Sequence, residues 1–222
     1  MWPRAGCRWC ISGSGTLLRP SPTNVKRYDH SYFHRWYHNP RTRVITRGDT
    51  RRKAQLAVSA AEYMLGRQVR TVLDVGAGEG TWLAPLRALR PRIHYTGVDP
   101  SEYAVRRFGR RRNIHWGTFG ELDADGLLSG TYDLVVCCGV VNYLSTSELR
   151  RGLGVIASML AGIAFIEVWT SGDDIVGDRR GWQEHPPAHY RRIFRRAGLV
   201  ACGMHCYVGP NLAAEAAALE KR

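Results

Sequence analysis

The feature that most constrains the fold is a hydrophobic strand that runs directly into a glycine-rich turn and a helix. Residues 72–75 read Val-Leu-Asp-Val, and Gly76, Gly78 and Gly80 follow before a helix predicted over 81–90. Glycines at this spacing permit a tight turn and let a ligand approach the backbone N–H groups closely. The run therefore predicts a strand-turn-helix unit with a ligand site at the carboxyl end of its strand.

Apolar runs and helical patterns alternate along the rest of the chain. Further helices are expected over 50–66, 101–110, 147–160 and 187–197, the first of them ending at Gly66 as its C-cap. Strands are expected over 72–75, 93–98, 114–116, 134–138, 163–169 and 199–208. The alternation predicts an α/β fold, a doubly wound and mostly parallel sheet of six or seven strands with helices on both faces. The chain after the sixth strand looks too short for a full seventh strand.

Three acidic residues surround the predicted ligand site. Asp74 precedes the first glycine, Glu79 lies inside the turn, and Asp99 ends the next strand, about twenty residues beyond the glycines. Carboxylates at the turn would repel a pyrophosphate and attract a ligand that carries an ammonium and a sulfonium. A carboxylate at Asp99 can accept hydrogen bonds from both hydroxyls of a ribose. The pattern therefore favours S-adenosylmethionine over a dinucleotide.

These residues resemble the class I S-adenosylmethionine-dependent methyltransferases, which have a Rossmann-like fold, and the resemblance covers about residues 45 to 208. It rests on the run 74–80, on Asp99, and on 132–138 as the fourth strand. The resemblance implies a set of cofactor contacts: Asp74, Gly76 and Gly78 at the methionine moiety, Asp99 at the ribose, Thr118 and Phe119 at the adenine, the Cys138 backbone beside the methionine end, and Tyr28 or Tyr32 near the methionine carboxylate. No acidic residue follows the third strand, where the family often has one.

Two segments are expected to face the acceptor. Asn142 and Tyr143 follow the fourth strand, where the nucleobase-methylating enzymes of this fold carry two prolines that this chain lacks. They are interpreted as pocket residues, although a helix N-terminal turn with a buried tyrosine fits equally well. Glu167 and Trp169 open a long, aromatic segment that ends at Tyr190 and is typical of a substrate loop. Within this segment His185 and His189 are candidate catalytic bases, and each fits a surface or capping role as well.

The chain carries a net charge of +13, and because only Lys26, Lys53 and Lys221 are lysines, arginine supplies 32 − 3 = 29 of its positive charges. The chain shows no compact basic motif with stacking aromatics, so a compositional excess of arginine is the simpler explanation. A methyltransferase acting on a small-molecule metabolite is the favoured function. An RNA methyltransferase that binds phosphates with a basic surface, and a non-catalytic S-adenosylmethionine-binding subunit, are the alternatives. The RNA surface would comprise Arg106, Arg107, Arg110, Arg111 and Arg112.

Three segments are expected: a flexible basic leader over 1–27, a methyltransferase domain with an N-terminal aromatic helix over 28–210, and a helical tail over 211–222. In the aromatic helix Tyr28, Tyr32 and Trp36 are spaced to share one face. No apolar run approaches the ~18 residues of a membrane helix, and the cysteine spacing does not suggest a disulfide framework. Cys7 and Cys10 have zinc-knuckle spacing without a second ligand pair nearby, so no metal is predicted. The expected location is the cytoplasm.

Overall fold

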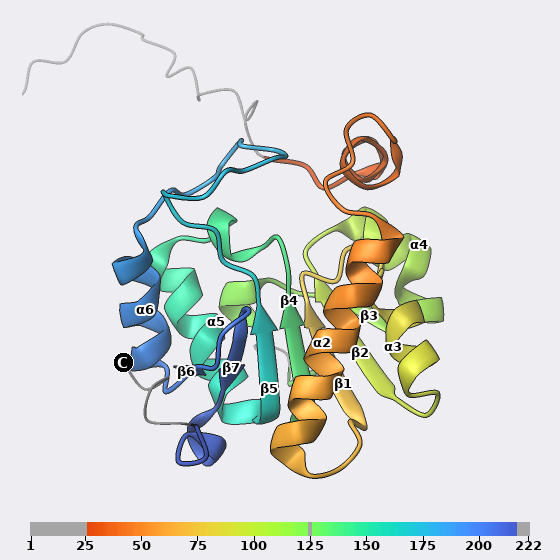
Figure 1. Cartoon of the computed structure of the whole chain (residues 1–222). Coiled ribbons are helices and arrows are strands. Elements are labelled where there is room, and N and C mark those ends of the chain that lie inside the picture. Colours follow the sequence, from red (N-terminus) through yellow and green to blue (C-terminus); the bar gives the residue numbers. More distant parts are fainter. Residues whose placement is uncertain (1–25, 124–125, 217–222) are drawn as a thin grey trace, which may run out of the picture.

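A computed structural model describes residues 26–123 and 126–216 of the chain. Its centre is a seven-stranded sheet with the order β3-β2-β1-β4-β5-β7-β6 (Figure 1). The strands are β1 (Thr71–Val75), β2 (His94–Asp99), β3 (Ile114–Trp116), β4 (Tyr132–Cys137), β5 (Leu160–Ile166), β6 (Val200–Ala201) and β7 (Cys206–Val208). The first five run parallel, and β7 is antiparallel to both of its neighbours. This confirms the predicted doubly wound, mostly parallel sheet.

Helices cover both faces of the sheet. They are α1 (His30–Phe33) with the π-helical turn η1 (His34–His38), α2 (Arg47–Leu65), α3 (Leu83–Leu89), α4 (Glu102–Arg112), α5 (Thr146–Met159) and α6 (Pro187–Arg196). Buried residues of α2 and α3 belong to one hydrophobic cluster, and those of α5 and α6 to the other. Short 3-10 turns occur at Phe119–Glu121, Val141–Tyr143 and Pro210–Leu212.

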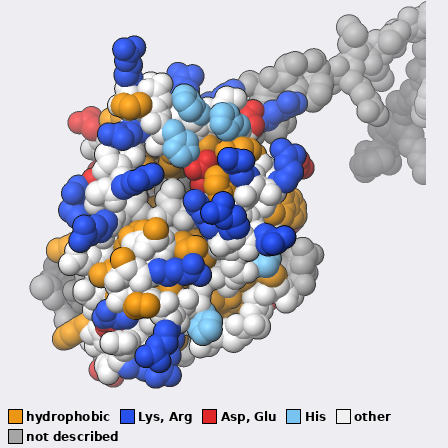
Figure 2. All heavy atoms as spheres, turned by 90° about the vertical axis from the view of Figure 1, so that its right-hand side faces the viewer, with side chains coloured by type: hydrophobic (Ala, Val, Ile, Leu, Met, Phe, Trp, Pro, Cys, Tyr) orange, Lys and Arg blue, Asp and Glu red, His pale blue; other side chains and the backbone are white. Residues whose placement is uncertain are grey.

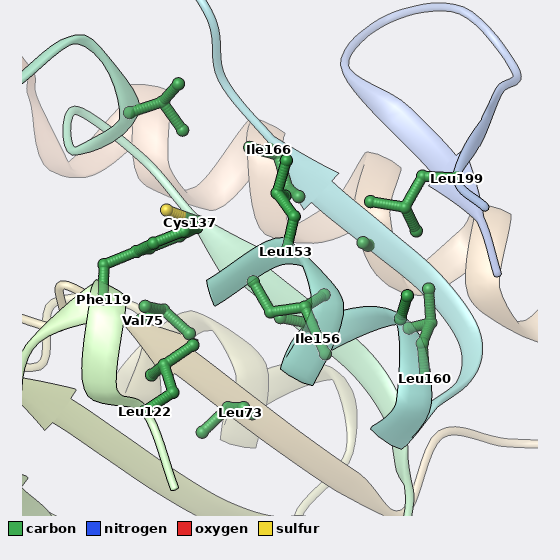
Figure 3. Packing of buried hydrophobic residues seen from close by; sticks show 14 of the residues in the cluster. Leu73, Val75, Phe119, Leu122, Cys137, Leu153, Ile156, Leu160, Ile166 and Leu199 are labelled. Carbon is green, nitrogen blue, oxygen red and sulfur yellow. The ribbon is translucent and has the colours of Figure 1, made fainter. Parts of the chain in front are cut away.

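The central strands are buried on both sides because their side chains alternate between the two clusters. In β1, Leu73 and Val75 enter the cluster beneath α5 and α6, whereas Val72 enters the cluster beneath α2 and α3. Figure 3 shows the first cluster, in which Leu73 and Val75 lie near Leu153 and Ile156 of α5. Near-continuous apolar strands of this kind are what a parallel sheet with two covered faces requires.

The predicted helix over 50–66 is confirmed as α2, with both ends determined by local sequence. Thr46 and Asp49 form a capping box at its N-terminus. Gly66 caps the other end in the left-handed conformation, with φ of 63°, and a Cβ at this φ would be strained.

Two strand predictions need correction. The strand expected over 163–169 lies at Leu160–Ile166, so Glu167 and Trp169 leave the sheet at its carboxyl edge. The strand expected over 199–208 is a hairpin of β6 and β7, because Gly203, Met204 and His205 all have positive φ and reverse the chain. Both the sixth and the seventh strand of the sheet therefore come from the segment predicted as the sixth strand alone.

The aromatic N-terminal segment is only partly helical as predicted. Asp29 caps α1 by accepting a hydrogen bond from the Tyr32 backbone, so Tyr28 precedes the helix and does not share a helical face with Tyr32 and Trp36. Residues 1–25 of the expected leader, with Cys7 and Cys10, and residues 217–222 of the expected tail lie outside the described residues. Within the described part, no helix has the length and apolar character needed to cross a bilayer.

Candidate active site

A pocket of about 330 Å³ lies where β1, β4 and β5 end, between the N-terminal aromatic segment and the loop after β5. Figure 1 shows these two segments meeting above the carboxyl edge of the sheet. Eight residues predicted from the sequence line it: Tyr32, Asp74, Gly76, Gly78, Cys138, Tyr143, Glu167 and Trp169. A pocket of this size at a crossover of a parallel sheet is where such folds bind their ligands.

The glycine turn after β1 forms one wall of the pocket. Gly76, Gly78 and Gly80 have φ of 75°, 53° and 71°, a region that favours glycine. The N–H groups of Gly76 and Ala77 donate to Val98 O at 2.8 and 3.1 Å, which ties the turn to β2. A Cβ on Gly76 would overlap the Val140 side chain, and one on Gly78 would lie 3.0 Å from the Phe33 ring. Because these positions carry no side chain, the backbone of the turn stays accessible beside Val140 and Phe33. We call this turn, Gly76 to Gly80, the glycine cradle.

Asp74 and Asp99 supply negative charge beside this cradle. Asp74 is 2% exposed and accepts a 2.6 Å hydrogen bond from the Tyr95 hydroxyl. Burial raises the pKa of Asp74 to about 7. Asp99 accepts hydrogen bonds from the N–H groups of Gly78 at 2.6 Å and Ser101 at 2.8 Å, and burial raises its pKa. These buried carboxylates fit a cationic ligand.

Glu79 adds a third acidic group from inside the turn. Its side chain lies 2.8 Å from His38 Nε2 at the end of η1, and it lines the pocket. The guanidinium of Arg112 donates to the Glu79 carbonyl from α4. Glu79 therefore links the glycine turn to the N-terminal segment that covers the pocket.

Aromatic rings form the roof of the pocket. Tyr32, Phe33, Trp36 and Tyr37 all line it, and Phe33 is buried against Tyr37 with ring centroids 5.6 Å apart. Tyr28 does not line the pocket. It packs edge-to-face on Tyr32 at 5.0 Å, and its pKa is raised to about 12 by burial and then by the charge of Asp99.

The pocket lining also contains a partly buried ion pair. Lys53 of α2 lies 2.6 Å from the carboxylate of Glu167, which follows β5. Both residues line the pocket with Cys138 and Trp169. Burial holds the pKa of the Cys138 thiol well above its usual value, so a thiolate nucleophile is disfavoured there.

Asn142, predicted as a pocket residue, holds the loop instead. Its side-chain amide donates to Trp169 O at 2.6 Å and to the Tyr190 hydroxyl at 3.0 Å, and its oxygen accepts from Trp169 N at 3.1 Å. A buried amide with these partners has little capacity left for a ligand. Asn142 is absent from the pocket lining, whereas its neighbour Tyr143 donates from its hydroxyl to Asp178 O at 2.5 Å.

Asp99 lies behind the glycine turn and does not line the pocket itself, and four further predicted residues also lie outside the lining. His185 and His189 stack on each other with ring centroids 4.0 Å apart, and His189 lies 3.3 Å from Thr146 Oγ1 of α5. Burial lowers the pKa of His189. The Phe119 side chain belongs to the cluster beneath α5, and neither it nor Thr118 lines the pocket. The assignments of these four residues remain predictions, without support from the pocket geometry.

Sequence reasoning missed Lys53 and Asp178 as pocket residues, although one signal pointed to Lys53. Lysine is rare in this arginine-rich chain, and Lys26 and Lys53 both form ion pairs with carboxylates of the pocket lining. A compact ammonium on a flexible stem reaches a buried carboxylate where a planar guanidinium does not fit. Asp178 gave no local signal, because its partner Lys26 lies far away in the sequence.

A basic groove of about 870 Å³ lies beside the pocket, between α2 and α3 and next to the end of α4. Arginines surround an apolar floor that includes Leu83, Ala84 and Pro85. The arginines are Arg47, Arg51, Arg87, Arg111 and Arg112. Figure 2 shows how densely Lys and Arg side chains, with hydrophobic ones between them, populate this side of the molecule.

Residues 73–162 match a family model described as a methyltransferase domain. No curated protein sequence matches the chain. Among solved structures, the sugar N-methyltransferase KedS8 from Streptoalloteichus sp. is 20% identical, with a TM-score of 0.58 over 86% of this chain and 91% of that one. DesVI from Streptomyces venezuelae is 18% identical, with a TM-score of 0.56 over 73% and 91%.

S-adenosylmethionine-bound CalS10, an amino pentose methyltransferase from Micromonospora echinaspora, is 20% identical, with a TM-score of 0.55 over 68% of this chain and 83% of that one. At these identities the likeness shows the fold. The glycine cradle, the buried carboxylates and the strand order agree with it. Residues 73–162 therefore match a methyltransferase domain, and the described chain has the Rossmann-like fold that these methyltransferase structures share.

Proposed function

We propose that the chain transfers a methyl group from S-adenosylmethionine to a small-molecule metabolite. The observation that carries this proposal is one pocket with two different walls. The glycine turn and Asp74 form one wall, and Lys53, Glu167 and Trp169 form the other. A donor on the first wall would present its methyl group to an acceptor on the second.

The residues present fit the donor. Asp74 and the turn at Gly76 and Gly78 are placed to bind its methionine moiety, and Asp99 to accept hydrogen bonds from its ribose. Each oxygen of Asp99 accepts one backbone hydrogen bond, which leaves further lone pairs for hydroxyls. The donor supplies a methyl carbon already activated by its sulfonium, so the protein mainly has to position the acceptor.

The acceptor wall is suited to positioning. The Glu167 carboxylate lies 2.6 Å from Lys53 Nζ and can accept a hydrogen bond from an acceptor O–H or N–H. Trp169, whose backbone is held at both N and O by Asn142, provides a rigid apolar surface. The similarity to CalS10 and KedS8, described as an amino pentose and a sugar N-methyltransferase, supports a small-molecule acceptor.

Two assays test donor and acceptor separately. Calorimetry should show binding of S-adenosylhomocysteine and none of NAD. Incubation with isotopically labelled donor and fractionated metabolite pools should give a small product heavier by one methyl group, detected by mass spectrometry. Preferential NAD binding would refute the donor, and label found only in RNA would replace the small-molecule acceptor.

RNA is the second candidate acceptor, and one observation favours it: the basic groove opens beside the pocket and shares Tyr37, Glu79 and Thr81 with it. The apolar floor of the groove, at Leu83, Ala84 and Pro85, contains no aromatic ring on which bases could stack.

We also propose a cytoplasmic location, which rests on the absence of a disulfide framework from the cysteine spacing.

A further inference from the structure

The side chain of Lys26 lies in a cage of tyrosines next to the pocket. Its Nζ is 3.4 Å from the ring centroid of Tyr143, 5.2 Å from that of Tyr28 and 5.3 Å from that of Tyr32. The carboxylate of Asp178 lies 3.2 Å away, and both charged side chains are only 11% exposed. Several ring faces and one carboxylate around a single position form a binding site for an organic cation.

The cage is an unfavourable environment for the charged form of Lys26, because burial lowers its pKa. Three buried side-chain polar atoms of the described residues have no hydrogen-bond partner: Lys26 Nζ, Asp178 Oδ2 and Trp182 Nε1. Lys26 Nζ and Asp178 Oδ2 lie 3.2 Å apart and attract each other as opposite charges, yet burial still lowers the pKa of Lys26. Buried polar groups are almost always hydrogen-bonded, and each exception calls for an explanation. Here the exceptions cluster on one side of one pocket.

The cage opens into that pocket, and Asp178 and Trp182 belong to the loop after β5 that also carries Glu167 and Trp169 of the acceptor wall. Tyr32, Tyr143, Asp178 and Trp182 all belong to the pocket lining, whereas Lys26 does not. Trp182 packs at right angles on Tyr143, with ring centroids 5.3 Å apart, so its unpartnered N–H lies beside the cage. A ligand in the acceptor half can therefore reach both groups at once.

The geometry points to an acceptor that carries an ammonium group with an oxygen nearby, and we infer that this ammonium takes the place of Lys26 in the cage. The ammonium would bind the faces of Tyr143 and Tyr32 and pair with Asp178. The neighbouring oxygen would accept a hydrogen bond from Trp182 Nε1. The assignment deepens the proposed function and rests on it: the substrate class is an amino alcohol or an amino sugar.

The cage binds the ammonium group of the acceptor, and the atom that is methylated is a different one. A protonated amine has no lone pair, so it cannot attack the methyl carbon while it is held as an ammonium beside Asp178. The Asp178 backbone contributes to the geometry as well, because its carbonyl accepts the Tyr143 hydroxyl. Asp178, Tyr143 and Trp182 are thus specificity-determining residues. In the free protein the Lys26 ammonium occupies the cage.

The test compares binding of choline with that of its neutral isostere, in which a tert-butyl group replaces the trimethylammonium. In the full-length Lys26→Gln variant the cage loses its internal cation. Calorimetry should show choline binding about tenfold tighter than in the wild type, a gain typical of a desolvated cation-aromatic contact. Binding of the isostere should not change. Adding Asp178→Asn or Tyr143→Leu to Lys26→Gln should reverse the gain.

Arg27→Gln is the matched control, because it removes an exposed positive charge one residue away from the cage. It should leave choline affinity at the wild-type level. Equal affinities of Lys26→Gln for choline and its isostere, or no gain over the wild type, would overturn the inference. Circular dichroism verifies that each variant is folded, and Lys26→Arg provides a second variant that keeps the charge. Binding of S-adenosylhomocysteine is scored separately, so failure of the donor site and failure of the cage are distinguishable.

Discussion

The carboxylate of Asp99, the last residue of β2, accepts a 2.6 Å hydrogen bond from the backbone N–H of Gly78 in the turn after β1. This contact joins the two strand ends at which a donor would bind. Asp99 therefore shapes the cradle, and we propose that its remaining lone pairs accept hydrogen bonds from the donor's ribose.

Replacement of Asp99 by alanine should weaken S-adenosylhomocysteine binding by roughly tenfold to a hundredfold, since hydrogen bonds to a charged group contribute about 1.5–3 kcal/mol each. Calorimetry measures the affinity, and circular dichroism verifies the fold. Glu102→Ala, an exposed carboxylate at the start of α4, is the control and should have no effect. An unchanged affinity in Asp99→Ala would place the ribose elsewhere.

Gly76→Ala should destabilise the protein by at least about 1 kcal/mol and abolish donor binding, because its left-handed φ is unfavourable for other residues and the new methyl overlaps Val140. Gly154→Ala is the matched control: it lies exposed within α5 with nothing within 4 Å of an added Cβ. That change should stabilise the protein by about 0.5–1 kcal/mol. Thermal unfolding distinguishes the two, and a benign Gly76→Ala would argue against the cradle.

The buried carboxyl of Asp74 should make the free protein less stable as pH rises from about 4 to 7. Its pKa is raised to about 7 from an ordinary value of 3.8, so between these values the folded state holds a proton that the unfolded state has lost. Stability falls with pH wherever the folded state binds more protons. The unfolding free energy of Asp74→Asn relative to wild type should therefore increase across this range in urea titrations. A pH-independent difference would show that Asp74 is ionised throughout.

Donor affinity should change with pH in the opposite direction. A donor ammonium binds the ionised form of Asp74, so affinity for S-adenosylmethionine should rise as pH increases through about 7. Calorimetry at neutral pH in two buffers with different ionisation enthalpies should detect proton release on binding. Asp74→Asn should remove most of that release, and its persistence in the variant would assign it to another group.

The double variant His185→Ala/His189→Ala should keep turnover within about threefold of wild type, because neither ring lines the pocket. Removal of a general base would instead lower the rate by about 10²-fold or more and abolish the alkaline plateau of the rate-pH profile. Measurement of that profile decides between these outcomes. A lost plateau would restore the prediction made from the sequence.

The basic groove should bind RNA weakly and without sequence preference, with an affinity that falls steeply as salt increases. A combined alanine variant of Arg47, Arg51, Arg87 and Arg111 should lose no more RNA affinity in gel shifts than an equally charged control variant on α6. The control positions are Arg191, Arg192, Arg195 and Arg196, which are exposed. A selective loss in the groove variant would favour RNA as the acceptor.

The local features of the fold could be predicted from the sequence. The glycine turn, Asp99 at the end of its strand, and Gly66 as the end of α2 were all recognised, because turn chemistry and capping depend on a few adjacent residues. Element boundaries were less accurate: β5 begins and ends three residues before its predicted position, since an apolar run does not show where pairing with β4 stops. The hairpin of β6 and β7 was missed because its turn contains Met204 and His205 at positive φ, which sequence patterns do not predict.

The sequence by itself therefore determined the alternating α/β architecture and the part of the pocket that we propose binds the donor, where the relevant groups lie within one strand-turn-helix unit and the strand that follows it. The tertiary structure decided the acceptor half. Asn142 and Tyr143 are neighbours in sequence, yet the side-chain amide of Asn142 hydrogen-bonds to Trp169 and Tyr190, whereas Tyr143 lines the pocket. The ion pairs of Lys53 with Glu167 and of Lys26 with Asp178 join distant parts of the chain. Such contacts exist only after the sheet brings its strand ends together, because no local periodicity specifies which distant side chain will fill the same buried space.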